Sequence, residues 1–102
     1  MLLLTTVMVA CAGNTPPTPA LSPEAARGKV VYAASCTACH NADPAKAGSL
    51  GPDVKGSSRE LLEARVLKAE YPAGYTPKRS STLMTPLPAL AGDIEALAAY
   101  LK

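Results

Sequence analysis

Two cysteines and one histidine that stand close together in residues 36–40 are the side chains best suited to chemistry. Cys36 and Cys39 are three positions apart, so both thiols lie on one side of a helical turn, and His40 follows directly. This C-x-x-C-H spacing is the signature of covalent haem attachment. In such sites the two thiols form thioethers to the haem vinyl groups, and the histidine ring binds the iron from the proximal side. The sequence therefore predicts one covalently bound haem c.

Three other roles for the cysteine pair are weaker. A structural zinc site takes about four Cys or His ligands, whereas the chain beyond its N-terminal segment offers three, and the adjacent Cys39 and His40 are poorly placed to share one ion. A thioredoxin-like redox pair needs a βαβ setting, and no strand pattern accompanies this one. A structural disulfide suits an oxidising compartment, but it leaves a core without Trp or Phe unexplained.

The second axial ligand of the iron is predicted to be Met84. His40 is the only histidine, and the other two methionines lie in the first ten residues. Pro86 and Pro88 follow Met84 and disfavour a helix there, so a stiff extended segment can hold the thioether against a flat group at low entropic cost. The alternative is that Met84 fills space in the core, which is the usual role of a lone methionine.

Three helices are expected to position these ligands, and the fold class is all-α because no stretch alternates apolar and polar residues for long enough to form a strand. The first helix begins with Ser22 as a cap, Pro23 at the first helical position and Glu24 near the positive end, and it runs to about Ala34.

The other two helices show start signals of their own. Ser57 and Glu60 have the spacing of a capping box, and the helix that follows is expected to stop before Pro72. Asp93 is predicted to cap the last helix, whose apolar residues recur at helical spacing: Ile94, Leu97, Ala98 and Leu101.

The N-terminal segment is predicted to lie outside the folded domain. Residues 1–10 are apolar but too short to span a bilayer, and they indicate a secretion signal. Residues 8–11 are similar to a lipoprotein lipobox, which predicts a lipid on Cys11; the alternative is an ordinary signal with a chance cysteine. Three prolines make residues 11–22 a semi-rigid tether, so the domain is expected to span residues 23–102.

Composition bounds the fold and the partners. A chain of 102 residues has room for one domain, and so small a core is marginal without a staple or a cofactor. Apolar residues make up 48% of the chain, yet Trp and Phe are absent, and a haem would supply the missing large flat group. The net charge of +2 comes without a run of like charges, so nucleic-acid binding is not expected.

Residues 22–102 resemble a small bacterial class I cytochrome c. Besides the haem motif, the matches are Gly28 with Tyr32, Leu97 with Tyr100, Gly51 with Pro52, and Met84. In this family the first and last helices cross closely at the glycine, and the proline carbonyl usually accepts the histidine ring N–H. The resemblance therefore implies a cytochrome c-like fold of three main helices around the haem, with Pro52 beside the proximal ligand and Met84 as the distal one.

The sequence departs from the family pattern at two places. Thr85 separates Met84 from the proline that often follows it directly, and residues 71–79 have no clear counterpart in the smallest members. Three side chains of this loop are candidates to contact the haem propionates, against the alternative of simple solvation: Tyr75, Lys78 and Arg79. Lys55 and Arg59 are weaker candidates.

An iron with both axial positions filled by protein exchanges single electrons but does not readily bind a substrate. The first hypothesis is therefore a one-electron carrier, not an enzyme, on the periplasmic side of the bacterial cell envelope. It would be anchored to a membrane by its lipid and would meet redox partner proteins as a monomer or as a subunit of a complex. The alternative is the haem subunit of a multi-protein periplasmic oxidoreductase, such as a sulfur-oxidising or dehydrogenase complex. An open-site haem that senses a gas or reacts with peroxide applies if Met84 does not bind.

Overall fold

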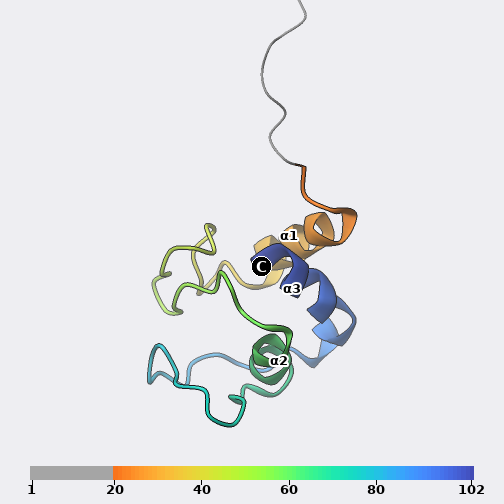
Figure 1. Ribbon diagram of the computed structural model, residues 1–102. Helices are drawn as coiled ribbons and strands as arrows, with labels where there is room; N and C mark the ends of the chain where they lie inside the picture. The colour runs from red at the N-terminus through yellow and green to blue at the C-terminus, as the bar shows by residue number, and fades with distance from the viewer. Residues whose placement is uncertain (1–19) are drawn as a thin grey trace, which may run out of the picture.

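The computed structural model describes residues 20–102, and within them the fold is all-α, as predicted. These residues contain no strand. In chain order the elements are α1 (Pro23–Ser35), α2 (Arg59–Leu62), the π-helical η1 (Glu63–Leu67), the 3₁₀-helical η2 (Pro88–Asp93) and α3 (Ile94–Leu101). Figure 1 shows α1 and α3 side by side, α2 set apart from α1, and two long loops that extend to the same side of the helices.

The predicted secretion signal at residues 1–10 and the predicted lipidation site Cys11 lie outside the described residues, as does most of the 11–22 tether. Helix α1 begins at Pro23. No helix in the described part of the chain is long and apolar enough to cross a membrane.

Helix α1 leads directly into the cysteine motif. It begins as predicted, since the Ser22 side chain accepts a hydrogen bond from the Ala25 amide at 3.1 Å and a proline takes the first helical position. At its end the Cys36 N–H donates to Tyr32 O at 2.9 Å, and the His40 N–H donates to Cys36 O at 2.9 Å. The motif is thus one further turn of the chain whose shape is set by local backbone hydrogen bonds.

The predicted capping box at Ser57 and Glu60 is wrong by one residue. The cap of α2 is Ser58, whose side chain accepts from the Leu61 amide at 3.1 Å. The Ser57 hydroxyl instead donates to Val54 O at 2.5 Å, within a turn that its own amide also closes onto Val54 O. Because that turn already engages Ser57, the next hydroxyl in the chain is the one free to cap the helix.

The second helical segment also ends earlier than expected. After α2 the chain widens into η1, and Ala69 then takes a left-handed conformation with φ 54°. The Glu70 amide folds back to Ala64 O at 2.9 Å, which closes the end of the helix. The helix therefore stops at this reversal, before Pro72 can act, and its buried residues are Leu62 and Val66.

Asp93 stands at the predicted start of α3 but does not cap it with its side chain. Its carboxylate pairs with Arg27 of α1 at 2.8 Å instead. The amides of α3 need no side-chain cap of this kind because η2 runs into the helix from Pro88, a residue that fits the first position of a helix. The extended segment predicted around Met84 therefore ends at Leu87, and Pro88 belongs to a helix.

The apolar core lies where α1 crosses α3 and extends to α2 and η1. Its buried hydrophobic residues, among those described, are Ala25, Tyr32, Leu62, Val66, Ile94, Ala96, Leu97 and Leu101. Gly28 lies at the crossing, where a Cβ would collide with the Ala96 carbonyl and would lie 2.9 Å from Tyr100 Cβ. The two helices can approach this closely because glycine has no side chain.

Tyr32 ties this core to the loop that follows the motif. Only 2% of its surface is exposed, and its ring lies tilted against that of Tyr100 with the centroids 5.7 Å apart. The Tyr32 hydroxyl donates to Asn41 O at 2.5 Å. Burial raises the pKa of this hydroxyl to about 12, so it remains a neutral donor at physiological pH.

Replacing Gly28 by alanine should destabilise the holoprotein. The new Cβ would meet backbone atoms of Ala96, which cannot rotate away, and overpacking of this kind costs about 1–3 kcal/mol. Urea or thermal unfolding of the holoprotein measures the loss. Gly92→Ala is the matched control, because nothing lies within 4 Å of a Cβ at that position. Equal unfolding free energies for the two variants would contradict the proposed close crossing.

Candidate functional site

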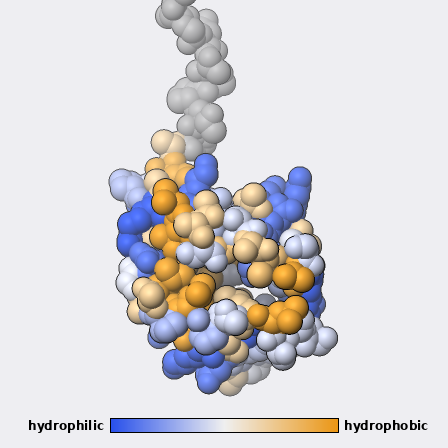
Figure 2. Space-filling model, turned by 180° about the vertical axis from the view of Figure 1, so that it is seen from behind, coloured by the Kyte–Doolittle hydropathy of each residue, from blue (hydrophilic) through white to orange (hydrophobic). Residues whose placement is uncertain are grey.

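A cavity of about 550 Å³ opens between the helices and the two long loops. Five residues that the sequence analysis placed at the haem attachment and iron ligation sites line it: Cys36, Cys39, His40, Pro52 and Met84. Residues of the apolar core also form part of its wall, among them Tyr32, Leu62 and Leu97. Figure 2 shows this face of the molecule hollowed, with hydrophobic side chains around the opening. The fold thus gathers residues far apart in sequence around one mostly apolar space.

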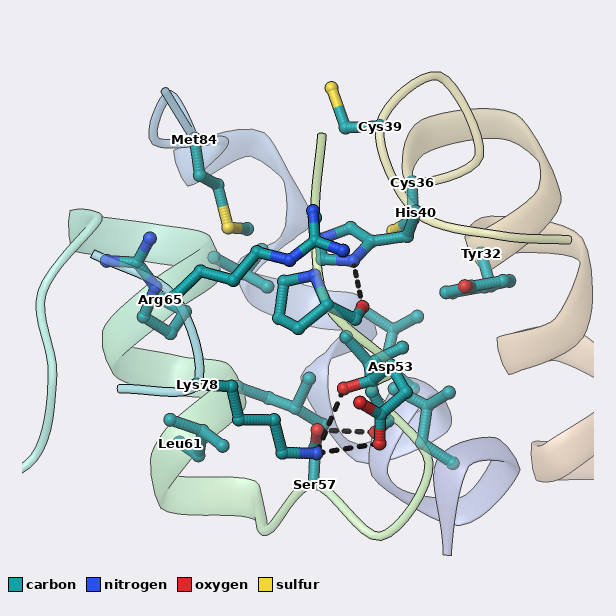
Figure 3. A pocket seen from close by; sticks show the side chains of 18 of the residues that line it. Tyr32, Cys36, Cys39, His40, Asp53, Ser57, Leu61, Arg65, Lys78 and Met84 are labelled. Atoms are coloured by element: carbon teal, nitrogen blue, oxygen red, sulfur yellow. Dashed lines mark hydrogen bonds and ion pairs between the residues drawn. The ribbon is translucent and has the colours of Figure 1, made fainter. Parts of the chain in front are cut away.

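His40 is held in one orientation by the carbonyl of Pro52. Its Nδ1 lies 2.9 Å from Pro52 O (Figure 3). Because a carbonyl oxygen can only accept, Nδ1 carries a hydrogen, and in the neutral ring Nε2 then keeps the lone pair. This is the contact that the resemblance implied for Pro52, and it leaves the nitrogen that can bind a metal ion available.

The turn at residues 48–53 packs under the histidine. The Leu50 and Gly51 amides donate to Cys39 O at 3.2 and 2.9 Å, and the Gly48 amide closes the turn onto Gly51 O at 2.9 Å. A Cβ on Gly51 would lie 2.5 Å from His40 Nδ1 and 2.9 Å from Nε2. Glycine is needed here because the backbone of the turn lies flat against the imidazole ring.

No disulfide joins the two motif cysteines, of which Cys36 is partly buried and Cys39 exposed. The structural disulfide weighed as an alternative is therefore not formed. Burial raises the pKa of the Cys36 thiol. Within residues 20–102 no three His, Cys, Asp or Glu side chains converge as a metal-binding group, so this part of the chain does not assemble the ligand set of a structural zinc ion.

Met84 reaches the cavity from the segment between η1 and η2. It is partly buried and packs against the core cluster. The segment is attached beyond Met84 by the Leu87 amide, which donates to Val66 O at 2.6 Å. In Figure 3 the Met84 sulfur points into the space that His40 also faces. One imidazole and one thioether from different loops thus face a single space.

The loop at residues 71–79 contributes polar side chains to the same cavity. Tyr75, Lys78 and Arg79 all line it, as does Lys55. Lys78 pairs with Asp53 at 2.9 Å, and this hydrogen bond lowers the pKa of the Asp53 carboxyl. The weak candidate Arg59 does not line the cavity; it pairs with two carboxylates on the surface, those of Glu63 and Glu95. The position of this loop agrees with the propionate hypothesis, which stays a prediction.

Arg65 and Tyr71 also line the cavity, and the sequence analysis missed both. The Arg65 guanidinium lies 4.1 Å from the centroid of the Tyr71 ring, which in turn stacks on Tyr75 with the centroids 5.6 Å apart. Arg65 also donates to Ala69 O at 2.8 Å. Its spacing in the sequence could have indicated Arg65. It lies three positions after Leu62 and four after Leu61, so in a helix it shares a face with these two leucines, which line the cavity.

Fold and site together define a small helical protein that holds one covalent haem. An apolar cavity, a thiol pair, a histidine with a free Nε2 and a glycine turn that clears the ring all fit that group. Residues 25–102 match the family described as Cytochrome c, and the chain belongs to the cytochrome c family. Neither a search of curated proteins nor a search of solved structures found a match.

Membership of the family establishes the cofactor and the general role. Proteins of this family bind haem c covalently, and the small size of the chain agrees with a single haem. The protein is therefore a haem-based electron carrier. The family generally carries electrons rather than catalysing a reaction, and it typically interacts with redox partners.

Replacing Gly51 by alanine should disturb the proximal side without removing the haem. The thioether cysteines stay in place, but the added methyl group would press on the His40 ring. We expect a high-spin fraction in the ferric absorption spectrum of the holoprotein and a loss of about 1–3 kcal/mol in unfolding free energy. Gly92→Ala serves as the control. A Gly51→Ala spectrum indistinguishable from that of the wild type would contradict the tight contact.

Proposed function

We propose that this protein is a one-electron carrier of the bacterial cell envelope, with haem c attached through Cys36 and Cys39 and ligated by His40 and Met84. The observation that carries the proposal is the convergence of these four residues on one cavity, although Met84 comes from a separate loop. In that arrangement His40 and Met84 would both hold the iron, and no open position would remain on it for a substrate.

Each residue has a distinct part in this function. The haem supplies an iron that gains or loses one electron when the group is bound. Pro52 O fixes the His40 ring, and Gly51 lets the turn lie against it. Met84 is held between the core cluster and the Leu87 anchor. Because these groups are held in place by the fold, the change of charge at the site requires little movement of the protein.

Electron exchange is assigned to the open edge of the cavity. Leu50 and Leu83 line the cavity and are 47% and 63% exposed. Hydrophobic side chains surround the opening in Figure 2, and we call them the apolar rim. A net charge of +2 provides little long-range steering. We assign brief, mainly apolar contacts with redox partner proteins of the envelope to this rim, since weak electron-transfer encounters are small. Of the three loop candidates for the haem propionates, Tyr75 is assigned this role, because Lys78 and Arg79 already donate to Asp53 and Gly48.

The cell-envelope location rests on the sequence pattern of the N-terminal segment. Residues 1–10 have the character of a secretion signal, and residues 8–11 that of a lipobox. A lipid on Cys11 and a Pro-rich tether over residues 11–22 would hold the domain near a membrane while leaving its cavity edge accessible.

Met84→Ala tests the distal ligand. In the ferric wild-type holoprotein we expect a sulfur-to-iron charge-transfer band, and we expect Met84→Ala to lose it while the haem stays covalently attached. Leu83→Ala is the matched control, because it shortens the neighbouring exposed side chain. A band that persists in Met84→Ala would refute the ligation, and its absence from the wild type would favour the open-site haem.

Cys11→Ala tests the membrane anchor. When the full chain is produced with its own N-terminal segment, the wild type should fractionate with membranes and the variant should move to the soluble envelope fraction. Equal distributions would contradict lipidation of Cys11. The same preparations test the alternative function, since a stoichiometric partner that co-purifies with the wild type would make the chain a subunit of an oxidoreductase complex.

A further inference from the structure

Two adjacent residues attach the loop at residues 71–79 to the turn at residues 48–53. The Lys78 ammonium donates to both the backbone carbonyl of Asp53, at 3.1 Å, and its carboxylate, at 2.9 Å. The Arg79 guanidinium donates to Gly48 O at 3.2 Å. The loop is therefore hydrogen-bonded to both ends of the turn, at Gly48 and at Asp53.

That turn is the one that orients the proximal histidine. Asp53 is bonded through its nitrogen to the Pro52 carbonyl carbon, so the position of Asp53 sets the direction in which Pro52 O points. Pro52 O in turn accepts from His40 Nδ1 at 2.9 Å. Figure 3 shows Lys78 bound to Asp53 on the same side of the cavity as this contact. The Lys78 ammonium thus restrains the residue next to the histidine's hydrogen-bond acceptor.

The same loop leads to the distal residue. Met84 follows Lys78 by six positions and lies between two attachments, the Lys78 and Arg79 bonds before it and the Leu87–Val66 hydrogen bond after it. Residues 80–83 are exposed, so these flanking bonds restrain the path of the segment.

We propose that Lys78 and Arg79 are positioning residues that couple the two axial ligands. Together with Asp53 and Gly48 they form what we call the clasp. The inference rests on the proposed ligation by His40 and Met84. The clasp holds the Met84 segment against the turn that orients His40, and so resists displacement of the Met84 sulfur by an external ligand. Because the Lys78 and Asp53 side chains are 44% and 45% exposed, salt screens their attraction and weakens the clasp.

Imidazole binding to the ferric holoprotein measures this coupling, since imidazole can bind the iron only after the Met84 sulfur leaves. We expect Lys78→Gln and Asp53→Asn each to raise the apparent imidazole affinity by about two- to fivefold, the range that an exposed ion pair supports. The double variant should not exceed Lys78→Gln, because Lys78→Gln already removes the ion pair that Asp53→Asn removes, together with the bond to the Asp53 carbonyl. Lys78→Arg should retain the wild-type affinity, since a guanidinium can also reach both oxygens of Asp53.

Salt and a matched charge change separate the clasp from general electrostatics. High ionic strength should move the wild type toward the Lys78→Gln affinity and leave that variant nearly unchanged. Lys46→Gln is the control: Lys46 is exposed, lies two positions before Gly48, and among the described residues makes no side-chain hydrogen bond or ion pair that its loss would break. The thermal midpoint of each variant is recorded to show that the affinity does not simply follow stability.

Three results would overturn the coupling: a Lys78→Gln affinity equal to that of Lys46→Gln, additive effects of Lys78→Gln and Asp53→Asn, or affinities that track the thermal midpoints. If one single variant fails to fold, the imidazole affinity of the other single variant and the salt dependence of the wild type still test the coupling. The charge-transfer band of the wild type is recorded first, because its absence would refute Met84 ligation itself, whereas its presence with no clasp effect would refute only the coupling.

Discussion

The haem completes a core that the chain alone leaves open. The buried hydrophobic residues described here lie at the crossing of α1 and α3 and along α2 and η1, and several of them also line the cavity. The sequence has no Trp or Phe, and the tyrosines Tyr32, Tyr71 and Tyr75 line that space without filling it. Because a domain of this size buries little apolar surface by itself, the cofactor acts both as the redox centre and as the missing part of the core.

The elements around the cavity differ in how they are held. Helix α1, the motif turn and the turn at residues 48–53 are joined by short-range backbone hydrogen bonds, such as those to Cys36 O and Cys39 O. The Met84 segment has few bonds of its own and depends on attachments at its two ends. The His40 side of the cavity is therefore held by backbone hydrogen bonds within one stretch of chain, and the Met84 side by contacts between loops. Salt and substitution can weaken the contacts between loops.

Sequence reasoning was most reliable where the determining interactions are close in the chain. The cap at Ser22 and the start of α1 were correct because cap and helix are neighbours. The predicted capping box at Ser57 was wrong because the Ser57 hydroxyl donates to Val54 O in the preceding turn. The predicted side-chain cap at Asp93 was wrong because its carboxylate forms an ion pair with Arg27. The early end of the second helical segment follows from the left-handed Ala69, a residue type that gives no warning of such a reversal.

The sequence by itself determined the cofactor, since two thiols and an imidazole within one turn are a local arrangement with a single well-matched chemistry. It also determined the all-α class, because helical periodicity is a property of neighbouring residues. Only the tertiary structure decided which polar groups surround the site. Lys78 meets Asp53 across 25 positions and Arg79 meets Gly48 across 31. No local pattern encodes such pairs, because they form only after the packing of helices and loops has brought distant segments to the same edge of the cavity.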